Sequence, residues 1–204
     1  MSFDVPHSLP EDGEGSASLH VLALALDERD RYTDTHCQRV ARIALALGQR
    51  CELSTERLSH LSLAARFHDV GKIGIRDNVL LHPGHLGEEQ MESMRTHPDR
   101  GARLFAASGR RDAAAVARLI RHHHEAYDGS GYPAGLKGRE IPLEARILTI
   151  ADGYDAMTSK RPYRGPMPHS RAMRILADGQ EGLIDPDVFR EFTCIIKASA
   201  LLEA

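Results

Sequence analysis

Histidine and aspartate side chains recur on the apolar faces of the helices that this sequence predicts. Imidazole and carboxylate groups are unfavourable in a protein interior unless each has a polar partner. At about 3.6 residues per turn, His36 falls on the apolar face that contains Val40 and Leu47. The full set of such residues is His36, His68, Asp69, His97, His123, His124 and Asp152. Because so many inward polar groups need common partners, the pattern favours a pair of bound metal ions.

The three consecutive histidines after Arg121 are divided by the same periodicity. Val116 and Ile120 face the core of their helix, and the same face extends to His123 and His124. His122 aligns with the polar side, so the sequence predicts a surface position and no role for it. The other histidines are predicted to lie in tails, loops or polar faces, and they are given no role: His7, His20, His60, His82, His85 and His169.

The composition and periodicity predict an all-α fold of seven to nine helices. The 204 residues are 42% hydrophobic and 27% charged, which suits one globular domain, and Ala and Leu far outnumber Ile and Val. A polar, turn-rich tail is predicted at 1–17 and a single domain at 18–204. Helices are predicted at 18–31, 35–51, 55–70, 88–95, 98–107, 112–124, 143–159, 169–178 and 186–202, leaving 71–87 and 125–142 as long irregular segments. Ser54 and Asp112 are the predicted N-caps of two of these helices.

The formal charge and the cysteines exclude some classes of protein. A net charge of −3 argues against broad binding of nucleic-acid polymers or membrane surfaces. The apolar run from Leu19 to Leu26 is too short to span a bilayer and lacks the layout of a signal peptide. Three cysteines, Cys37, Cys51 and Cys194, are read as reduced thiols in the core of a cytoplasmic protein.

Two motifs in the chain resemble those of a known family. HDVGKIG at 68–74 resembles the HD-x-G-K-I-G signature of HD-domain phosphohydrolases. HHEAYDGSGYP at 123–133 resembles the HHE-x-x-DGxGYP signature of their HD-GYP branch. Further similar segments occur at 29–36, 97–98 and 151–164, so the resemblance covers about residues 18–192.

The resemblance implies a site with two divalent transition metals, with Fe or Mn favoured over Ni or Zn. It assigns His36, His68 and Asp152 to one metal, with Asp69 bridging. The second metal is assigned to His97, His123 and His124. Some members bind a third metal through a Glu four residues before the first His, but this chain has Tyr32 there. The expectation is therefore a binuclear site.

The family resemblance also implies an activity, the hydrolysis of cyclic di-GMP to linear pGpG or further to GMP; some members prefer cyclic GMP-AMP. Two metals about 3.5–4 Å apart can share a water and lower its pKa to about 7. Asp69 and Lys72 are the expected catalytic residues. The expected substrate-binding residues are Lys72, Tyr132, Arg161 and Arg164, and Asp128 and Asp155 are expected to orient ligands or loops.

Two other functions remain open at the level of the sequence. The chain could be a non-catalytic signalling module that binds diguanylate cyclases or other signalling proteins through the GYP loop. It could also be an HD hydrolase that acts on another nucleotide. The complete set of inward ligands weighs against the first alternative, and the GYP loop with Arg161 and Arg164 weighs against the second.

Overall fold

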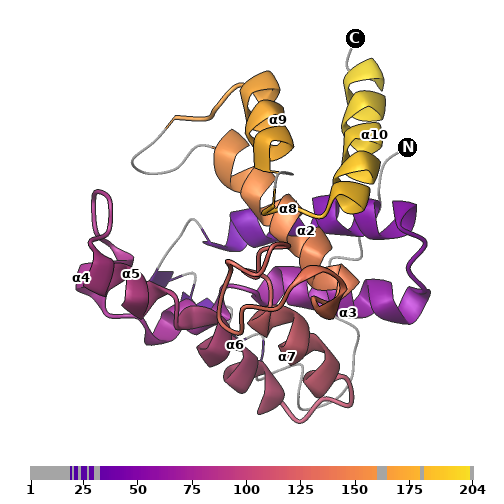
Figure 1. Cartoon of the computed structure of the whole chain (residues 1–204). Coiled ribbons are helices and arrows are strands. Elements are labelled where there is room, and N and C mark those ends of the chain that lie inside the picture. The colour runs from indigo at the N-terminus through magenta and orange to yellow at the C-terminus, as the bar shows by residue number, and fades with distance from the viewer. Residues whose placement is uncertain are drawn as a thin grey trace.

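The computed structural model describes residues 19, 21–22, 24–26, 28–29, 33–159, 165–179 and 182–202, and within them the chain is helical without strands (Figure 1). The predicted tail at 1–17 lies outside the described residues. The residues described between 19 and 29 are helical, as predicted. Nine α-helices follow in the described part: α2 Thr33–Arg50, α3 Thr55–Phe67, α4 Asp77–Leu80, α5 Glu88–Met94, α6 His97–Ala106, α7 Ala113–Arg121, α8 Leu143–Thr158, α9 His169–Asp178 and α10 Pro186–Leu202. Two 3₁₀ helices, η1 Val70–Gly74 and η2 Gly138–Glu140, lie between them.

Two predicted helices end three residues earlier than expected. The helix predicted to reach residue 70 ends at Phe67, and the helix predicted to reach residue 124 ends at Arg121. The segment 71–87 was expected to be irregular, but it contains most of η1 and all of α4. The spacing of apolar residues continues from each helix into the tight turn that follows it, so this spacing does not show where the two helices end.

The core forms where α2, α3 and α8 pack together and α7 lies against α3 (Figure 1). Fully buried side chains from these helices include Leu47, Leu61, Ile120 and Leu148. Burying such a side chain contributes about 1.5–3 kcal/mol. Ser54 caps α3 as predicted, because its side chain accepts a hydrogen bond from the backbone N–H of Arg57.

Two glycines allow η1 to lie directly on α6. A Cβ atom at Gly71 would stand 1.9 Å from the carbonyl oxygen of His97 and 2.5 Å from the backbone nitrogen of Gly101. A Cβ atom at Gly101 would in turn stand 3.2 Å from the nitrogen of Gly71. This close backbone contact brings the end of α3 and the start of α6 together, and candidate ligands occupy both places.

None of the cysteines forms a disulfide within the described residues, as predicted, but only one of them is in the core. Cys37 is buried, Cys51 is partly buried and Cys194 is exposed. The interpretation of Cys194 as a core thiol is therefore wrong. Asp112 does precede α7, but its side chain binds the Arg110 guanidinium rather than capping the helix. Among the helices of the described part, none has the length and apolarity that crossing a membrane requires.

Candidate metal centre

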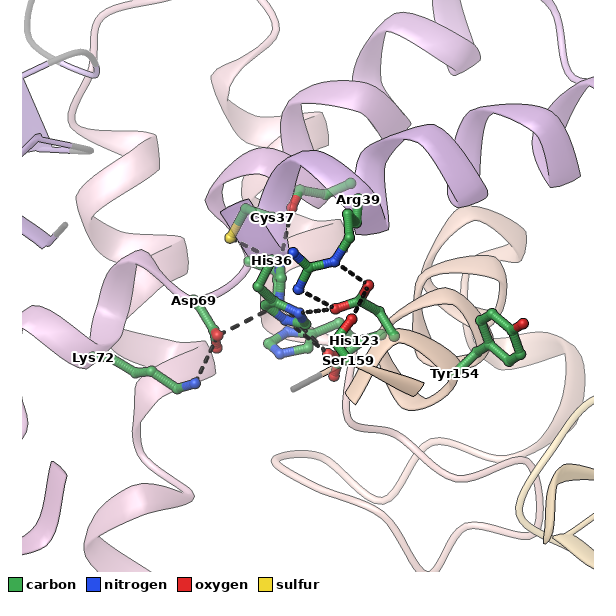
Figure 2. A network of polar contacts seen from close by, with 12 residues as sticks. His36, Cys37, Arg39, Asp69, Lys72, His123, Tyr154 and Ser159 are labelled. Atoms are coloured by element: carbon green, nitrogen blue, oxygen red, sulfur yellow. Dashed lines mark hydrogen bonds and ion pairs between the residues drawn. The ribbon is translucent and has the colours of Figure 1, made fainter. Parts of the chain in front are cut away.

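The structure brings together all seven of the residues that the sequence nominates as metal ligands. They come from the start of α2, the end of α3, the start of α6, the turn after α7 and the middle of α8. The ligand atoms of two subsets each lie within 4.8 Å of one another, one containing His97, His123 and His124, the other His36, His68 and Asp69. Figure 2 shows His36 inside the network, with Arg39 on one side and Asp69 and Lys72 on the other.

His36 is held between two aspartates of α8. Its Nδ1 lies 2.7 Å from Asp155 Oδ2, and its Nε2 lies 3.1 Å from Asp152 Oδ1. Asp155 is itself buried and accepts two hydrogen bonds from the Arg39 guanidinium, at 2.6 and 3.0 Å. The expectation that Asp155 orients a ligand agrees with this geometry, because a carboxylate on one ring nitrogen fixes the direction of the other.

Asp69 joins the two subsets. One of its oxygens, Oδ2, lies 3.6 Å from Nε2 of His68, and the other, Oδ1, lies 3.5 Å from Nε2 of His97. Asp152 is near the first subset, with Oδ1 3.9 Å from His68 Nε2. A carboxylate with one oxygen toward each subset has the geometry needed to bridge two cations.

Three of the histidines use one ring nitrogen in the same way. His68, His97 and His123 each direct Nδ1 to the backbone carbonyl three residues earlier, at 2.8, 2.8 and 2.6 Å. Each of these carbonyls belongs to the last turn of a helix, where carbonyls lack a partner within the helix. Because a carbonyl can only accept, Nδ1 carries the hydrogen in each ring and Nε2 presents a lone pair to the centre.

The arrangement of these lone pairs tests whether a metal fits the site. Nε2 of His97 and Nε2 of His123 lie 3.3 Å apart, although neither carries a hydrogen when Nδ1 donates to a carbonyl. Nε2 of His68 is buried and has no hydrogen-bond partner among the described residues. Converging lone pairs without hydrogens repel one another, whereas a shared cation satisfies them. The residues therefore fit a metal centre with nitrogen and carboxylate ligands.

Burial and charge set the protonation of these groups. Burial lowers the pKa of His97 to about 3, and it lowers those of His123 and His124, so these rings are neutral at pH 7. For His36, burial alone would lower the pKa, but hydrogen bonds to Asp152 and Asp155 raise it to about 9.

Asp69 stays ionised for a related reason. Burial alone would raise its pKa, but Lys72 and the surrounding histidines hold the pKa well below its usual value. The neutral rings of His97, His123 and His124 and the ionised Asp69 are ligands of the kind that divalent transition metals require, whereas the ring of His36 must lose a proton before it can bind a metal.

The residues predicted to contact substrate are only partly described. Lys72 lies beside the centre, where its Nζ donates to Asp69 Oδ2 at 2.6 Å. Tyr132 packs on His124 with ring centroids 5.0 Å apart, and the Arg95 guanidinium lies 5.5 Å from the Tyr132 ring centroid. Burial raises the pKa of Tyr132 to about 12, so it is a neutral hydroxyl at pH 7. The predicted phosphate-binding residues Arg161 and Arg164, and also Tyr32, lie outside the described residues.

The prediction for His122 is wrong. Its side chain is 8% exposed, and Nδ1 lies 3.1 Å from Glu125 Oε1. The helical phase that assigned His122 to the surface does not apply, because α7 ends at Arg121 and His122 adopts φ −107° and ψ 15°.

Besides Arg39, sequence reasoning missed Glu125. It is 2% exposed, and its two oxygens accept hydrogen bonds from the backbone N–H groups of Ala134 and Leu136, at 2.9 and 3.1 Å. These bonds fasten the GYP loop that carries Tyr132. The position of Glu125 in the HHE motif was the sequence signal that could have identified it as a site residue. Asp128 also supports this loop, by accepting from the backbone N–H of Ser130 at 2.8 Å.

Comparison with known proteins agrees with this geometry. The model of the HD domain family matches residues 20–188. The chain belongs to the HD domain family. The predicted assignment to the HD domain family is thus confirmed. A cyclic GMP-AMP phosphodiesterase structure from V. cholerae has a TM-score of 0.68 at 22% identity, covering 91% of this chain and 50% of that one. An HDG"Y"P protein from Bdellovibrio bacteriovorus has a TM-score of 0.66 at 19% identity, covering 90% and 61%, and both likenesses support the fold.

Two curated relatives of this HD domain are closer in sequence. The cyclic di-GMP phosphodiesterase response regulator RpfG of Xanthomonas campestris is 40% identical over 186 residues, which is 91% of this chain and 48% of the relative. A cyclic di-GMP phosphodiesterase of Thermotoga maritima is 38% identical over 174 residues, or 85% and 47% of the two chains. This HD domain therefore spans about half the length of these relatives.

Proposed function

We propose that this HD domain is a metal-dependent phosphodiesterase that hydrolyses cyclic di-GMP to linear pGpG in bacterial signalling. The observation that carries the proposal is the pair of ligand subsets joined by the two oxygens of Asp69. Relatives named cyclic di-GMP phosphodiesterases support the choice of substrate. The proposed cofactors are two divalent transition metals, with Fe or Mn favoured over Ni or Zn, and the proposed location is the cytoplasm.

In this proposal, His36, His68 and Asp152 hold one metal and Asp69 bridges to the second, which binds the histidines of the other subset. When bound, such a pair supplies a water of lowered pKa and neutralises charge on phosphoryl oxygens. The imidazole of His97 presents its lone pair without first losing a proton, because burial keeps its pKa at about 3. The ring of His36 has a pKa of about 9, so it must release a proton when it binds a metal.

The reaction adds water across one phosphodiester bond. The water oxygen attacks one phosphorus atom, the bond from phosphorus to the 3′-oxygen breaks, and the 3′-oxygen takes up a proton. Lys72 is proposed to direct its ammonium to the phosphate that reacts, and Tyr132 is proposed to contact the substrate from the GYP loop. Arg161 and Arg164 are proposed to bind phosphate oxygens through paired N–H groups.

A second substrate is favoured by a specific similarity. Three relatives from Vibrio cholerae are named 3′3′-cGAMP-specific phosphodiesterases, and they are 34–38% identical to this chain. Cyclic GMP-AMP presents the same phosphodiester ring to the proposed centre. Discrimination between the two substrates therefore depends on contacts to one base rather than on the metal ligands.

The test is anaerobic purification with metal analysis, followed by chromatography of the products from cyclic di-GMP and from cyclic GMP-AMP. We expect two metals per chain and accumulation of pGpG, with GMP appearing if the second bond is also cleaved. Lys72→Ala should retain both metals and lower kcat by about 10²–10³. A fully loaded protein that turns over neither dinucleotide would favour the non-catalytic signalling module that binds diguanylate cyclases.

A further inference from the structure

A groove of about 910 Å³ runs between α6 and α7, and none of the proposed metal ligands lines it. The two helices pack against each other at the lower edge of the molecule in Figure 1. Alanine side chains supply the apolar lining, at neighbouring turns of each helix: Ala102, Ala106, Ala114 and Ala117. Two rows of methyl groups along adjacent helices leave room for close approach by a third helix.

Arginine side chains from both helices line the same groove. Arg100 and Arg103 belong to α6, and Arg118 and Arg121 belong to α7, whereas Asp99 is the only acidic residue of the lining. Within the part of the chain that the structure describes, the exposed side chains of Arg103 and Arg118 form no hydrogen bond or ion pair. The groove is therefore positively charged, although the whole chain has a formal charge of −3.

A buried polar group also faces the groove. His122 lines it at the end formed by the start of α6 and the end of α7, and its side chain is 8% exposed. Nδ1 of His122 is taken by Glu125, but Nε2 has no hydrogen-bond partner among the described residues. Nε2 is open to the groove, where a polar group of an occupant can bond to it.

These features distinguish between possible anionic occupants. Apart from the imidazole of His122, which Glu125 holds, the lining contains no aromatic side chain, so it offers little ring surface on which nucleic-acid bases could stack. Its apolar rows follow the axes of two helices, and its free guanidinium groups come from both of them. We propose that the α6–α7 groove is a docking site for an acidic amphipathic helix of a partner protein.

The expected occupant has a defined pattern. Small or apolar residues at intervals of three and four would face the alanine rows, and glutamates on both flanks would face Arg103 and Arg118. A polar side chain would meet Nε2 of His122. Because no metal ligand lines the groove, the proposal goes beyond the phosphodiesterase activity and does not depend on it.

The test uses a fluorescent synthetic peptide of about five helical turns with this pattern, and a second peptide with the same residues in permuted order. Fluorescence anisotropy with the full chain should show binding of the patterned peptide only. Arg103→Glu with Arg118→Glu should weaken that binding at least about tenfold, because it reverses two charges of the groove. The matched control reverses two exposed arginines of α9, Arg171→Glu with Arg174→Glu, and should leave binding unchanged.

A variant that fills the groove without changing its charge tests how much the shape of the groove contributes to peptide binding. Ala106→Trp keeps every arginine and should also abolish binding, since the indole would occupy the space of the helix. Equal binding of both peptides, or unchanged binding by the variant with reversed Arg103 and Arg118, would overturn the proposal. If the chain self-associates and the Arg103→Glu with Arg118→Glu variant does not, the occupant is a second copy of the chain. If a labelled single-stranded oligonucleotide binds and the same charge reversal weakens that binding equally, the occupant is a nucleic acid. Either result would overturn docking of a partner helix.

Discussion

Replacing Asp155 with asparagine should weaken metal binding without removing any proposed metal ligand. The Asp155 carboxylate lies 2.7 Å from His36 Nδ1, 2.6 and 3.0 Å from two nitrogens of Arg39, and 3.0 Å from the Ser159 hydroxyl. Asparagine is nearly isosteric, but it loses the charge and one of the two acceptor oxygens. His36 then loses the contact that fixes its tautomer and ring orientation.

The magnitude follows from the contacts. Loss of a carboxylate that orients a ligating histidine typically costs about 10–100-fold in metal affinity.

The stability of the metal-free protein should fall as well. Burial alone would raise the pKa of Asp155, but His36 and Arg39 hold it at about 2 instead of its ordinary 3.8. At about 1.4 kcal/mol for each factor of ten, the ionised carboxylate contributes about 2 kcal/mol at pH 7. This contribution is present above pH 3.8 and is lost as the pH falls through about 2.

The assay measures the two effects separately. Free Mn²⁺ is followed by its electron paramagnetic resonance signal during titration of the metal-free protein, and the free energy of unfolding is measured in urea. Asp112→Asn is the matched control, because Asp112 also holds an arginine through two hydrogen bonds, both at 2.8 Å, but outside the metal centre. It should lose stability and keep its affinity for Mn²⁺. If Asp155→Asn binds Mn²⁺ within about twofold of wild type, Asp155 does not orient His36 and the reasoning fails.

Three further changes test other parts of the structure. Asp69→Ala should lose bound metal, measured by elemental analysis, while the far-ultraviolet circular dichroism stays helical; retention of both metals would contradict a bridging role. Glu125→Gln should keep its metals but raise KM for cyclic di-GMP about tenfold with a smaller change in kcat, because an amide cannot accept both of the loop hydrogen bonds. An unchanged KM would show that the loop holds its place without this carboxylate. Glu144 is mostly buried, and although burial alone would raise its pKa, hydrogen bonds from Arg57 lower it below 4.5. Glu144→Gln should therefore lower the free energy of unfolding at pH 7 by about 1 kcal/mol, a small value because Arg57 is half-exposed. The difference from wild type should shrink below pH 4.5. If urea titrations gave the same difference at pH 7 and below pH 4.5, the ion pair would be ruled out as its cause.

Periodicity predicted the helical fold, and periodicity together with the family motifs nominated the seven side chains that converge. His36 and Asp152 lie within helices, where an apolar face extends without interruption to the ligand. Arg39 and Glu125 were missed because their partners are remote or are backbone groups. Arg39 pairs with Asp155, 116 residues away, and Glu125 binds backbone N–H groups of a loop. Neither kind of partner leaves a periodic trace in the sequence.

The prediction was wrong for the His122 side chain and right for the His123 side chain, and one feature of the structure explains both outcomes. Both residues lie beyond the last residue of α7, where the helical phase no longer determines the direction of a side chain. The His123 side chain is turned inward because its Nδ1 binds the carbonyl of Ile120, and the equivalent bonds at His68 and His97 go to Ala65 and Met94. Each helix end thus supplies a carbonyl that needs a donor, and a histidine three residues later supplies it while its Nε2 points to the centre. A helix that continued through residue 124 would satisfy the Ile120 carbonyl with the backbone N–H of His124 and leave the His123 ring free to rotate. The early ends of α3 and α7 are therefore part of what orients the ligands.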